Sequence, residues 1–247
     1  MGDKMNSRKS TGVIGLDEKT EGGFVDRSTV LLRGKAGTGK TAFCASFLYR
    51  GALNNEPGLL VTTEEEADDI RADIKEMFGW DLEHLEKKKL LKILSINLEI
   101  PYNVKEKDFG QTIHMYMLTL FEKIINSIKA IKAKRVVIDS VSILEMFLQN
   151  RYLSRTYILN LMKKLKSLGV TTLITEGISE EGGLLGDEAL TEFVVDAVIK
   201  LDFVPVSDRF KRTLTINKMR RTKHSTMILP FDFTKEGIKL MKFGERK

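Results

Sequence analysis

The segment GKAGTGKT, residues Gly34–Thr41, decides the fold that the sequence predicts. It matches the pattern G-x-x-x-x-G-K-[ST], in which glycines let backbone N–H groups turn toward a bound phosphate. The residues before it, 28–33, are apolar and β-prone, and residues 40–53 follow a helical pattern. A glycine-rich turn between a strand and a helix is the context that makes this motif credible. The sequence therefore predicts a phosphate-binding loop (a Walker A motif) for ATP.

The residues expected to hold the nucleotide are those of the loop and of the first turn of the following helix. They are Gly34, Lys35, Ala36, Gly37, Thr38, Gly39, Lys40, Thr41 and Ala42. The N-terminus of a helix adds partial positive charge beside the phosphates. We expect Lys40 to reach the β- and γ-phosphates, and we expect the hydroxyl of Thr41 to bind Mg²⁺.

Outward from the loop, strand and helix patterns alternate along the chain. Strands are predicted at 58–63, 90–96, 135–139 and 170–175, helices at 66–78, 109–133 and 154–168, and a connecting loop at 101–110. After residue 193, strand patterns follow one another without helices between them. The sequence therefore predicts an α/β fold with a mostly parallel central sheet, helices on its flanks and an antiparallel C-terminal edge.

Length and composition favour one domain. The chain has 247 residues, of which 42% are hydrophobic, and this is enough for a core that needs no covalent staples. The polar residues 1–9 are expected to form a flexible arm ahead of a single domain at 10–247. There is no signal-peptide pattern and no apolar run of about 18 residues, and the single Cys44 has no partner for a disulfide. We expect a cytoplasmic protein with no membrane partner.

A buried strand that ends in an acid suggests the metal partner. The stretch RVVIDS, residues 135–140, places Asp139 at the end of an apolar strand. A carboxylate there suits Mg²⁺, commonly through a water molecule. Aspartate also ends many buried strands without binding a metal. Together with the loop upstream, the pattern favours Asp139 as the Mg²⁺ partner.

Three glutamates follow the second predicted strand in LLVTTEEE, residues 59–66. The end of this strand is expected beside the phosphate loop, where a carboxylate could polarise water for attack on the γ-phosphate. Alternatively, the acids stabilise the N-terminus of the next helix. Both roles are compatible, with Glu66 and Asp68 serving the helix and Glu64 the water. Glu65 is a second candidate for the catalytic carboxylate.

Two cations lie close together in TINKMRRTKH, residues 215–224. Lys218 and Arg220 are two residues apart, so on an extended strand they share a face. Such a pair could reach the γ-phosphate of a neighbouring subunit. Alternatively, the charges belong to a solvated edge strand and prevent aggregation. Spacing alone favours the edge strand.

These motifs together resemble the KaiC-like branch of the RecA superfamily of ATPases. The resemblance covers residues 10–240 and rests on STGVIGLDE with EGGF, GKAGTGKTAFCASFLYRGALNNEPGLLVTTEE, FGWDLEHL, RVVIDSVS, LKSLGVTTLITEGIS and RTLTINKMRRTKH. It implies a RecA-like fold and a homo-oligomeric ring, commonly a hexamer, with a nucleotide at each interface.

The resemblance also assigns roles to residues. It implies that Glu64 and Glu65 activate water and that Lys218 and Arg220 act in trans on the adjacent subunit's nucleotide, which favours this role over the edge strand. It places a sensor of the γ-phosphate at Thr175 and Glu176. The expected activity is hydrolysis of ATP to ADP and phosphate.

The chain departs from the family's clock protein in two respects. That protein has two such domains, and the sequence here predicts one. Its self-phosphorylating domain carries an adjacent Ser-Thr pair, and the matching positions here are Glu192 and Phe193, with Thr191 nearby. Self-phosphorylation at this place is therefore not expected.

Two other functions stay open. Single-domain relatives resemble archaeal RadA paralogs, which bind single-stranded DNA, and a net charge of +6 is compatible with this partner. The segment expected to line a ring channel, 176–190, carries acids and no basic residue. Basic residues concentrate instead at 129–135, 163–166 and 209–223, so DNA is expected there if it binds. The third candidate is a nucleotide-sensing scaffold for a protein partner that is not identified.

Overall fold

A nine-stranded mixed sheet forms the centre of the structure, a computed structural model that describes residues 7–96, 106–141, 150–178, 192, 194–206 and 209–242. Its strands are β3 (Thr29–Gly34), β4 (Gly58–Thr62), β5 (Leu91–Ser95), β6 (Arg135–Asp139), β7 (Thr171–Gly177), β8 (Ala197–Val206), β9 (Arg209–Met219), β10 (Leu229–Thr234) and β11 (Gly237–Leu240). They are ordered β11-β10-β9-β8-β3-β7-β6-β4-β5. Strands β3 to β8 pair in parallel, whereas the pairs from β8 to β11 are antiparallel. The predicted parallel sheet with an antiparallel edge is confirmed.

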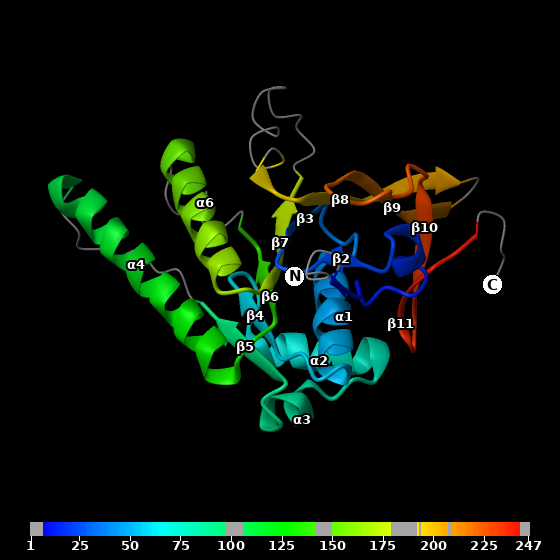
Figure 1. Cartoon of the computed structure of the whole chain (residues 1–247), viewed down its shortest axis with the longest axis horizontal. Coiled ribbons are helices and arrows are strands. Elements are labelled where there is room, and N and C mark those ends of the chain that lie inside the picture. Colours follow the sequence, from blue (N-terminus) through cyan, green and yellow to red (C-terminus); the bar gives the residue numbers. More distant parts are fainter. Residues whose placement is uncertain are drawn as a thin grey trace, which may run out of the picture.

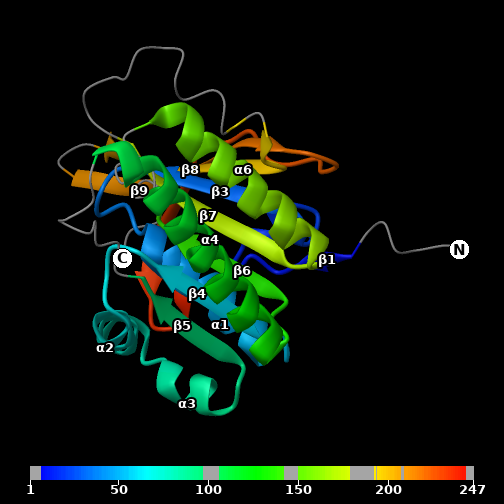
Figure 2. The ribbon, with the colours of Figure 1, turned by 90° about the vertical axis from the view of Figure 1, so that its left-hand side faces the viewer.

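Helices cover both faces of this sheet (Figures 1 and 2). They are α1 (Lys40–Leu53), α2 (Ala67–Phe78), α3 (Leu82–Lys87), α4 (Glu106–Ile131) and α6 (Arg151–Ser167), with a short 3-10 helix, η1 (Asp17–Lys19). Side chains of α1, α2 and α3 join one half of the core, and side chains of α4 and α6 join the other half. None of the helices in the described ranges is long and apolar enough to cross a membrane.

Strand β3 shows why the sheet is buried on both sides. All six of its residues are buried, with Leu31 in the half of the core under α4 and α6 and Leu32 in the half under α1. A strand covered by helices on both faces needs a continuous apolar run, and β3 has one. The phosphate-loop motif therefore starts from the rigid middle of the molecule.

Local structure differs from the sequence-based expectation in three places. Helix α4 begins at Glu106, so that residues 106–110 are helical and not part of a connecting loop. Helix α3, capped by the side chain of Asp81, was not expected. Arg8 and Lys9 form β1, which pairs with β2 (Phe24–Val25), and so belong to a strand and not to the flexible arm.

A buried arginine joins the second half of α1 to the start of β6. Arg135 is fully buried, and its Nε and Nη2 donate hydrogen bonds to Glu56 at 2.8 and 2.6 Å. Its Nη1 donates to the main-chain oxygens of Ser10 and Phe47, both at 2.8 Å. Burial alone would raise the pKa of Glu56, but hydrogen bonds from Lys9 and Arg135 outweigh it and lower the pKa. A buried guanidinium of this kind is tolerated because its donors are paired.

Gly51 leaves the room that this arginine occupies. A Cβ on Gly51 would lie 2.4 Å from Cδ of Arg135 and 3.1 Å from the main-chain oxygen of Glu56. We expect Gly51→Ala to lower the free energy of unfolding by about 1–3 kcal/mol, because a well-packed site has no space for another methyl group. The melting temperature, measured at one fixed protein concentration, checks this.

Gly110 supplies the matched control, because it is also helical but has no atom within 4 Å of an added Cβ. Gly110→Ala should raise the stability by roughly 0.5–1 kcal/mol, since alanine is the better helix former. Equal melting temperatures for the two variants would contradict the packing argument.

Candidate nucleotide site

The phosphate loop, residues 35–39, connects β3 to α1 at the carboxyl end of the parallel strands. Gly37 and Gly39 have φ angles of 74° and 103°, the left-handed region that glycine adopts without strain. A Cβ on Gly34 would lie 2.6 Å from Oγ1 of Thr38, so close packing also requires glycine at this position. The glycines of the motif thus serve the geometry of the loop itself.

The N-terminus of α1 offers free donors to an anion. No side chain caps this end, and the first intrahelical bond runs from the N–H of Phe43 to the oxygen of Gly39 at 2.9 Å. The N–H groups of residues 40–42 therefore have no acceptor inside the helix. Because the side chain of Ala42 is buried in the core, only its main-chain N–H can serve a nucleotide. Such an end is suited to phosphate.

Lys40 lies over the loop. Its Nζ donates to the main-chain oxygens of Gly34 at 2.9 Å and of Lys35 at 3.1 Å. The amine is therefore held against the main chain at the start of the loop. From this position a positive charge can reach phosphate oxygens that bind to the loop.

Asp139 lies between two threonine hydroxyls. Thr41 Oγ1 donates to one carboxylate oxygen at 2.9 Å, and Thr175 Oγ1 donates to the other at 2.5 Å. Burial raises the pKa of Asp139, although both hydrogen bonds oppose this. A carboxylate and hydroxyls form a hard oxygen donor set that fits Mg²⁺. The residues predicted for the metal, Thr41 and Asp139, are thus in direct contact.

Glu64 is held beside this carboxylate by residues that the sequence analysis did not single out. The hydroxyl of Ser140 donates to Oε1 of Glu64. Thr63 Oγ1 donates to the main-chain oxygen of Ser140 at 3.0 Å and accepts from its N–H at 3.1 Å, which joins the ends of β4 and β6. In the sequence, Thr63 directly precedes Glu64 and Ser140 directly follows Asp139. This adjacency to predicted site residues is the signal by which the sequence could have indicated them.

Glu65 also follows the carboxyl end of β4, but its environment differs from that of Glu64. Thr62 Oγ1 donates to the main-chain oxygen of Glu65 at 2.8 Å and accepts from its N–H at 3.2 Å, which fixes the turn that carries both glutamates. Partial burial raises the pKa of Glu65, and the negative charge of Asp139 raises it further. The charge of Asp139 thus acts on Glu65, whereas Glu64 has a hydrogen-bond donor of its own, the hydroxyl of Ser140.

The raised pKa of Asp139 makes the stability of the folded protein depend on pH. The folded protein binds a proton at Asp139 more tightly than the unfolded chain does. Stability therefore falls as pH rises from the ordinary pKa of an aspartate through the raised pKa. We expect Asp139→Asn to raise the melting temperature of the nucleotide-free protein at neutral pH, because asparagine never ionises. The gain should shrink on acidification, and melting curves across pH measure it.

Asp202 provides a control of opposite sign. A hydrogen bond from Lys200 lowers the pKa of Asp202, so its ionised form stabilises the fold above its ordinary pKa. Asp202→Asn should therefore bring no gain at neutral pH. If Asp139→Asn were less stable than the wild type at neutral pH, burial would not be the dominant influence on this carboxyl.

Arg220 lies at the opposite end of the sheet from the phosphate loop. Its main-chain N–H donates to the oxygen of Asp196 at 2.9 Å, and the N–H of Asp196 donates to the oxygen of Thr29 at 2.9 Å. Thr29 begins β3, and Gly34 ends it at the loop. Five residues of a strand span about 17 Å, which is further than an arginine side chain extends. Arg220 therefore cannot reach the phosphate loop of its own chain.

Lys218 points to the face of the sheet that α1 does not cover. It is paired with Val198 on β8, which in turn is paired with Leu31 on β3. Val198 and Leu31 belong to the half of the core under α4 and α6, and cross-strand partners share a face. Arg220 lies one residue beyond the end of β9, so of the pair only Lys218 belongs to the strand.

Other predicted residues fall in various places. Of the expected sensor pair, Thr175 contacts Asp139, whereas Glu176 forms an ion pair with Arg33 at 2.6 Å. Residues 179–191 and Phe193 lie outside the described residues, and with them most of the expected channel segment. Arg135, assigned to a basic surface for DNA, is fully buried and bound to Glu56, so it cannot contribute to such a surface.

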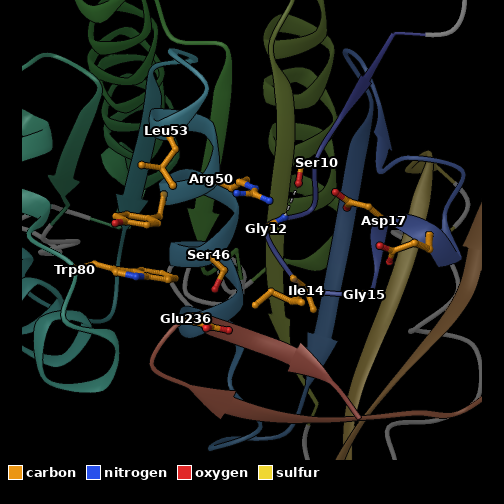
Figure 3. A pocket seen from close by; sticks show the side chains of 13 residues that line it. Ser10, Gly12, Ile14, Gly15, Asp17, Ser46, Arg50, Leu53, Trp80 and Glu236 are labelled. Carbon is orange, nitrogen blue, oxygen red and sulfur yellow. Dashed lines mark hydrogen bonds between the residues drawn. The ribbon is translucent and has the colours of Figure 1, made fainter. Parts of the chain in front are cut away.

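A cleft of about 360 Å³ lies beside the C-terminal half of α1 (Figure 3). Ser46 and Arg50 of α1 line it together with Ile14 and Trp80. The residues that line it do not include residues 35–41 of the phosphate motif. This cleft is therefore separate from the candidate nucleotide site.

Comparisons with known proteins agree with this geometry. A family model described as "ATPase: KaiC" matches residues 9–245. A UPF0273 protein of Methanocaldococcus jannaschii is 36% identical over 233 residues, which are 94% of this chain and 95% of that protein. The circadian clock oscillator protein KaiC of Prochlorococcus marinus is 35% identical over 235 residues, which are 95% of this chain but only 46% of that protein.

A solved structure is similar over nearly the whole chain. The crystal structure of a KaiC-like protein from the hyperthermophilic archaeon Pyrococcus horikoshii has a TM-score of 0.80 and 36% sequence identity. The match covers 96% of this chain and 100% of the other. The RecA-like architecture expected from the sequence is thus found in a KaiC-like protein.

Proposed function

The chain belongs to the KaiC family of ATPases, and on this premise we propose that it binds ATP with Mg²⁺ and hydrolyses it at sites that a neighbouring copy completes. One observation supports this most strongly. Three features meet at the carboxyl end of the parallel strands: the phosphate loop, the hydrogen-bonded pair Thr41–Asp139 and the oriented Glu64. These are the parts that positioning and electrostatic catalysis of phosphoryl transfer require.

Binding uses the loop and the end of α1. The free N–H groups of residues 40–42 face the phosphates, and Lys40 exchanges its bonds to loop carbonyls for bonds to phosphate oxygens. Thr41 and Asp139 would hold Mg²⁺, which supplies charge neutralisation at the β- and γ-phosphates when bound. A metal partner also relieves the cost of keeping the Asp139 carboxylate ionised in a buried place.

Hydrolysis uses Glu64 as the principal carboxylate. Ser140 holds one oxygen of Glu64, and the other is available to accept a hydrogen bond from an attacking water. A carboxylate positioned in this manner orients the water and accepts its proton. Glu65 is the lesser candidate, because its partial burial and then the charge of Asp139 raise its pKa and so disfavour the carboxylate form.

The transition state also needs cations that the chain does not bring to its own loop. Arg220 is at the far end of β3, and Lys218 is on the other face of the sheet. We assign both to the nucleotide of an adjacent copy, where they stabilise the charge on the γ-phosphate. A homo-oligomeric ring, commonly a hexamer in this family, provides that arrangement at each interface.

Phosphate release from the purified protein with Mg²⁺ and ATP tests this function. The wild type should turn over, and Glu64→Gln should slow release by about 10²- to 10⁴-fold, since general-base catalysis contributes that much. Glu236→Gln, an exposed change in the turn between β10 and β11, should match the wild type. Nucleotide binding without phosphate release by the wild type would instead indicate a sensing scaffold.

A further inference from the structure

Arg33 forms a buried ionic cluster on the face of the sheet that α4 and α6 cover. Its Nε lies 2.6 Å from Oε2 of Glu176, and its Nη1 donates to Oε1 of Glu192 at 2.6 Å. Only 9% of the Arg33 side chain is exposed, compared with 14% for Glu176 and 34% for Glu192. One cation thus faces two carboxylates, which leaves a net charge of −1 among the three.

Lys218 lies against this cluster. Its Nζ donates to the main-chain oxygen of Glu192 at 2.6 Å. Burial lowers the pKa of Lys218, and Arg220 lowers it further, whereas the charges of Asp196 and Glu192 act in the opposite direction. The carboxylate of Glu192 therefore favours the charged form of the Lys218 amine. The main-chain oxygen of the same glutamate accepts the hydrogen bond from that amine.

We propose that Glu192, anchored by Arg33, is a positioning residue that fixes Lys218 where it is presented to the nucleotide of the neighbouring copy. This rests on the proposed function, because it assumes that Lys218 acts in trans. Arg33 is a firm anchor, since it lies on the central strand and is followed directly by Gly34 at the loop. A long lysine side chain has many rotamers, and holding its amine at one place spares that entropy in the transition state.

The first test compares variants at position 192. Glu192→Ala removes the partner of Arg33 and the negative charge near Lys218, and it should lower kcat by roughly 10- to 100-fold with little change in KM for ATP. Glu192→Gln still offers an oxygen to Arg33, so it should recover part of the rate. Glu236→Gln is the control for loss of an exposed carboxylate. Melting temperatures and oligomeric state show whether each variant is folded and assembled.

The second test asks on which side of the interface the defect lies. Rings are assembled from Glu192→Ala subunits, which keep Glu64, and Glu64→Gln subunits, which keep an undisturbed Lys218. If the subunits mix at random, about a quarter of the interfaces combine both intact groups, and activity should return to about a quarter of the wild-type rate. Rings of Glu192→Ala and Arg220→Ala subunits should stay slow. Every subunit in them offers its neighbour either a misplaced Lys218 or no Arg220.

Other outcomes overturn the proposal. A wild-type or faster rate for Glu192→Ala would show that Lys218 does not depend on this residue. Recovery with Arg220→Ala subunits but not with Glu64→Gln subunits would place the defect in the chain's own site. Rings of Glu64→Gln and Arg220→Ala subunits, which are unchanged at position 192, report separately on completion in trans. A failure of the proposed function is thereby distinguished from a failure of this inference.

Discussion

Replacing Arg220 by alanine is expected to leave the affinity for ATP unchanged and to slow its hydrolysis by about 10³- to 10⁵-fold, the range for an arginine that stabilises phosphoryl transfer. Binding should persist because the loop, Lys40 and Thr41 belong to the other end of the sheet. Hydrolysis should fail because the charge that develops on the γ-phosphate loses its partner. Equilibrium binding of a fluorescent ATP analogue and phosphate release measure the two effects separately.

Arg209 provides the control, because it is exposed and begins the same strand, β9, near whose other end Arg220 lies. Arg209→Ala should hydrolyse ATP at the wild-type rate. The oligomeric state of both variants must match the wild type, so that loss of activity reports on chemistry and not on assembly. Normal hydrolysis by an assembled Arg220→Ala protein would contradict the assigned role.

Lys40→Ala is expected to abolish turnover by weakening nucleotide binding about a hundredfold or more, since removing one partner of a buried charge pair costs that much. The amine lies over the loop, where its Nζ is 2.9 Å from the main-chain oxygen of Gly34. Isothermal titration with Mg²⁺ and ATP measures the affinity. The thermal stabilisation that bound nucleotide gives the wild type should disappear as well.

Lys129 is a suitable control for the loss of one positive charge. It is exposed on α4, on the face of the sheet opposite to α1. Lys129→Ala should bind nucleotide as the wild type does. Equal affinities for Lys40→Ala and the wild type would mean that the loop does not hold the phosphates.

The parts of the fold that the sequence predicted are those with strong local signals. The helix at 40–53 and the strand at 135–139 have the predicted bounds, because a glycine-rich turn and an uninterrupted apolar run define them. Helix α3 was missed because it has only six residues and depends on its cap at Asp81 and on packing. The start of α4 was misplaced because Pro101 and Gly110 suggested a loop, although Gly110 lies within the helix.

The candidate site divides in the same manner. Thr41 and Asp139 follow from motifs, and the sheet brings them together because β3 and β6 are both neighbours of β7. Pairs such as Arg33 with Glu192 are far apart in the sequence, and no periodic pattern indicates them. Arg135 was assigned to a basic surface because composition does not report burial. Long-range packing decided each of these cases.

The distance between Arg220 and its own loop gives the proposed trans arrangement its physical basis. A chain that separates Arg220 from its phosphate site by the length of a strand, and that directs Lys218 to the other face of the sheet, is incomplete alone. Assembly then controls activity, because an isolated copy would bind ATP without the charges that stabilise the transition state. The same separation makes the roles of the two sides of an interface experimentally separable.

Rings assembled from two inactive variants test this most directly. Glu64→Gln and Arg220→Ala subunits, co-expressed with different tags and purified as mixed rings, should each be nearly inactive alone. Mixed rings should reach about a quarter of the wild-type rate, because half of the acceptor sites retain Glu64 and half of the donors retain Arg220. Mixed rings that are no faster than either variant alone would contradict the completion of each site by its neighbour.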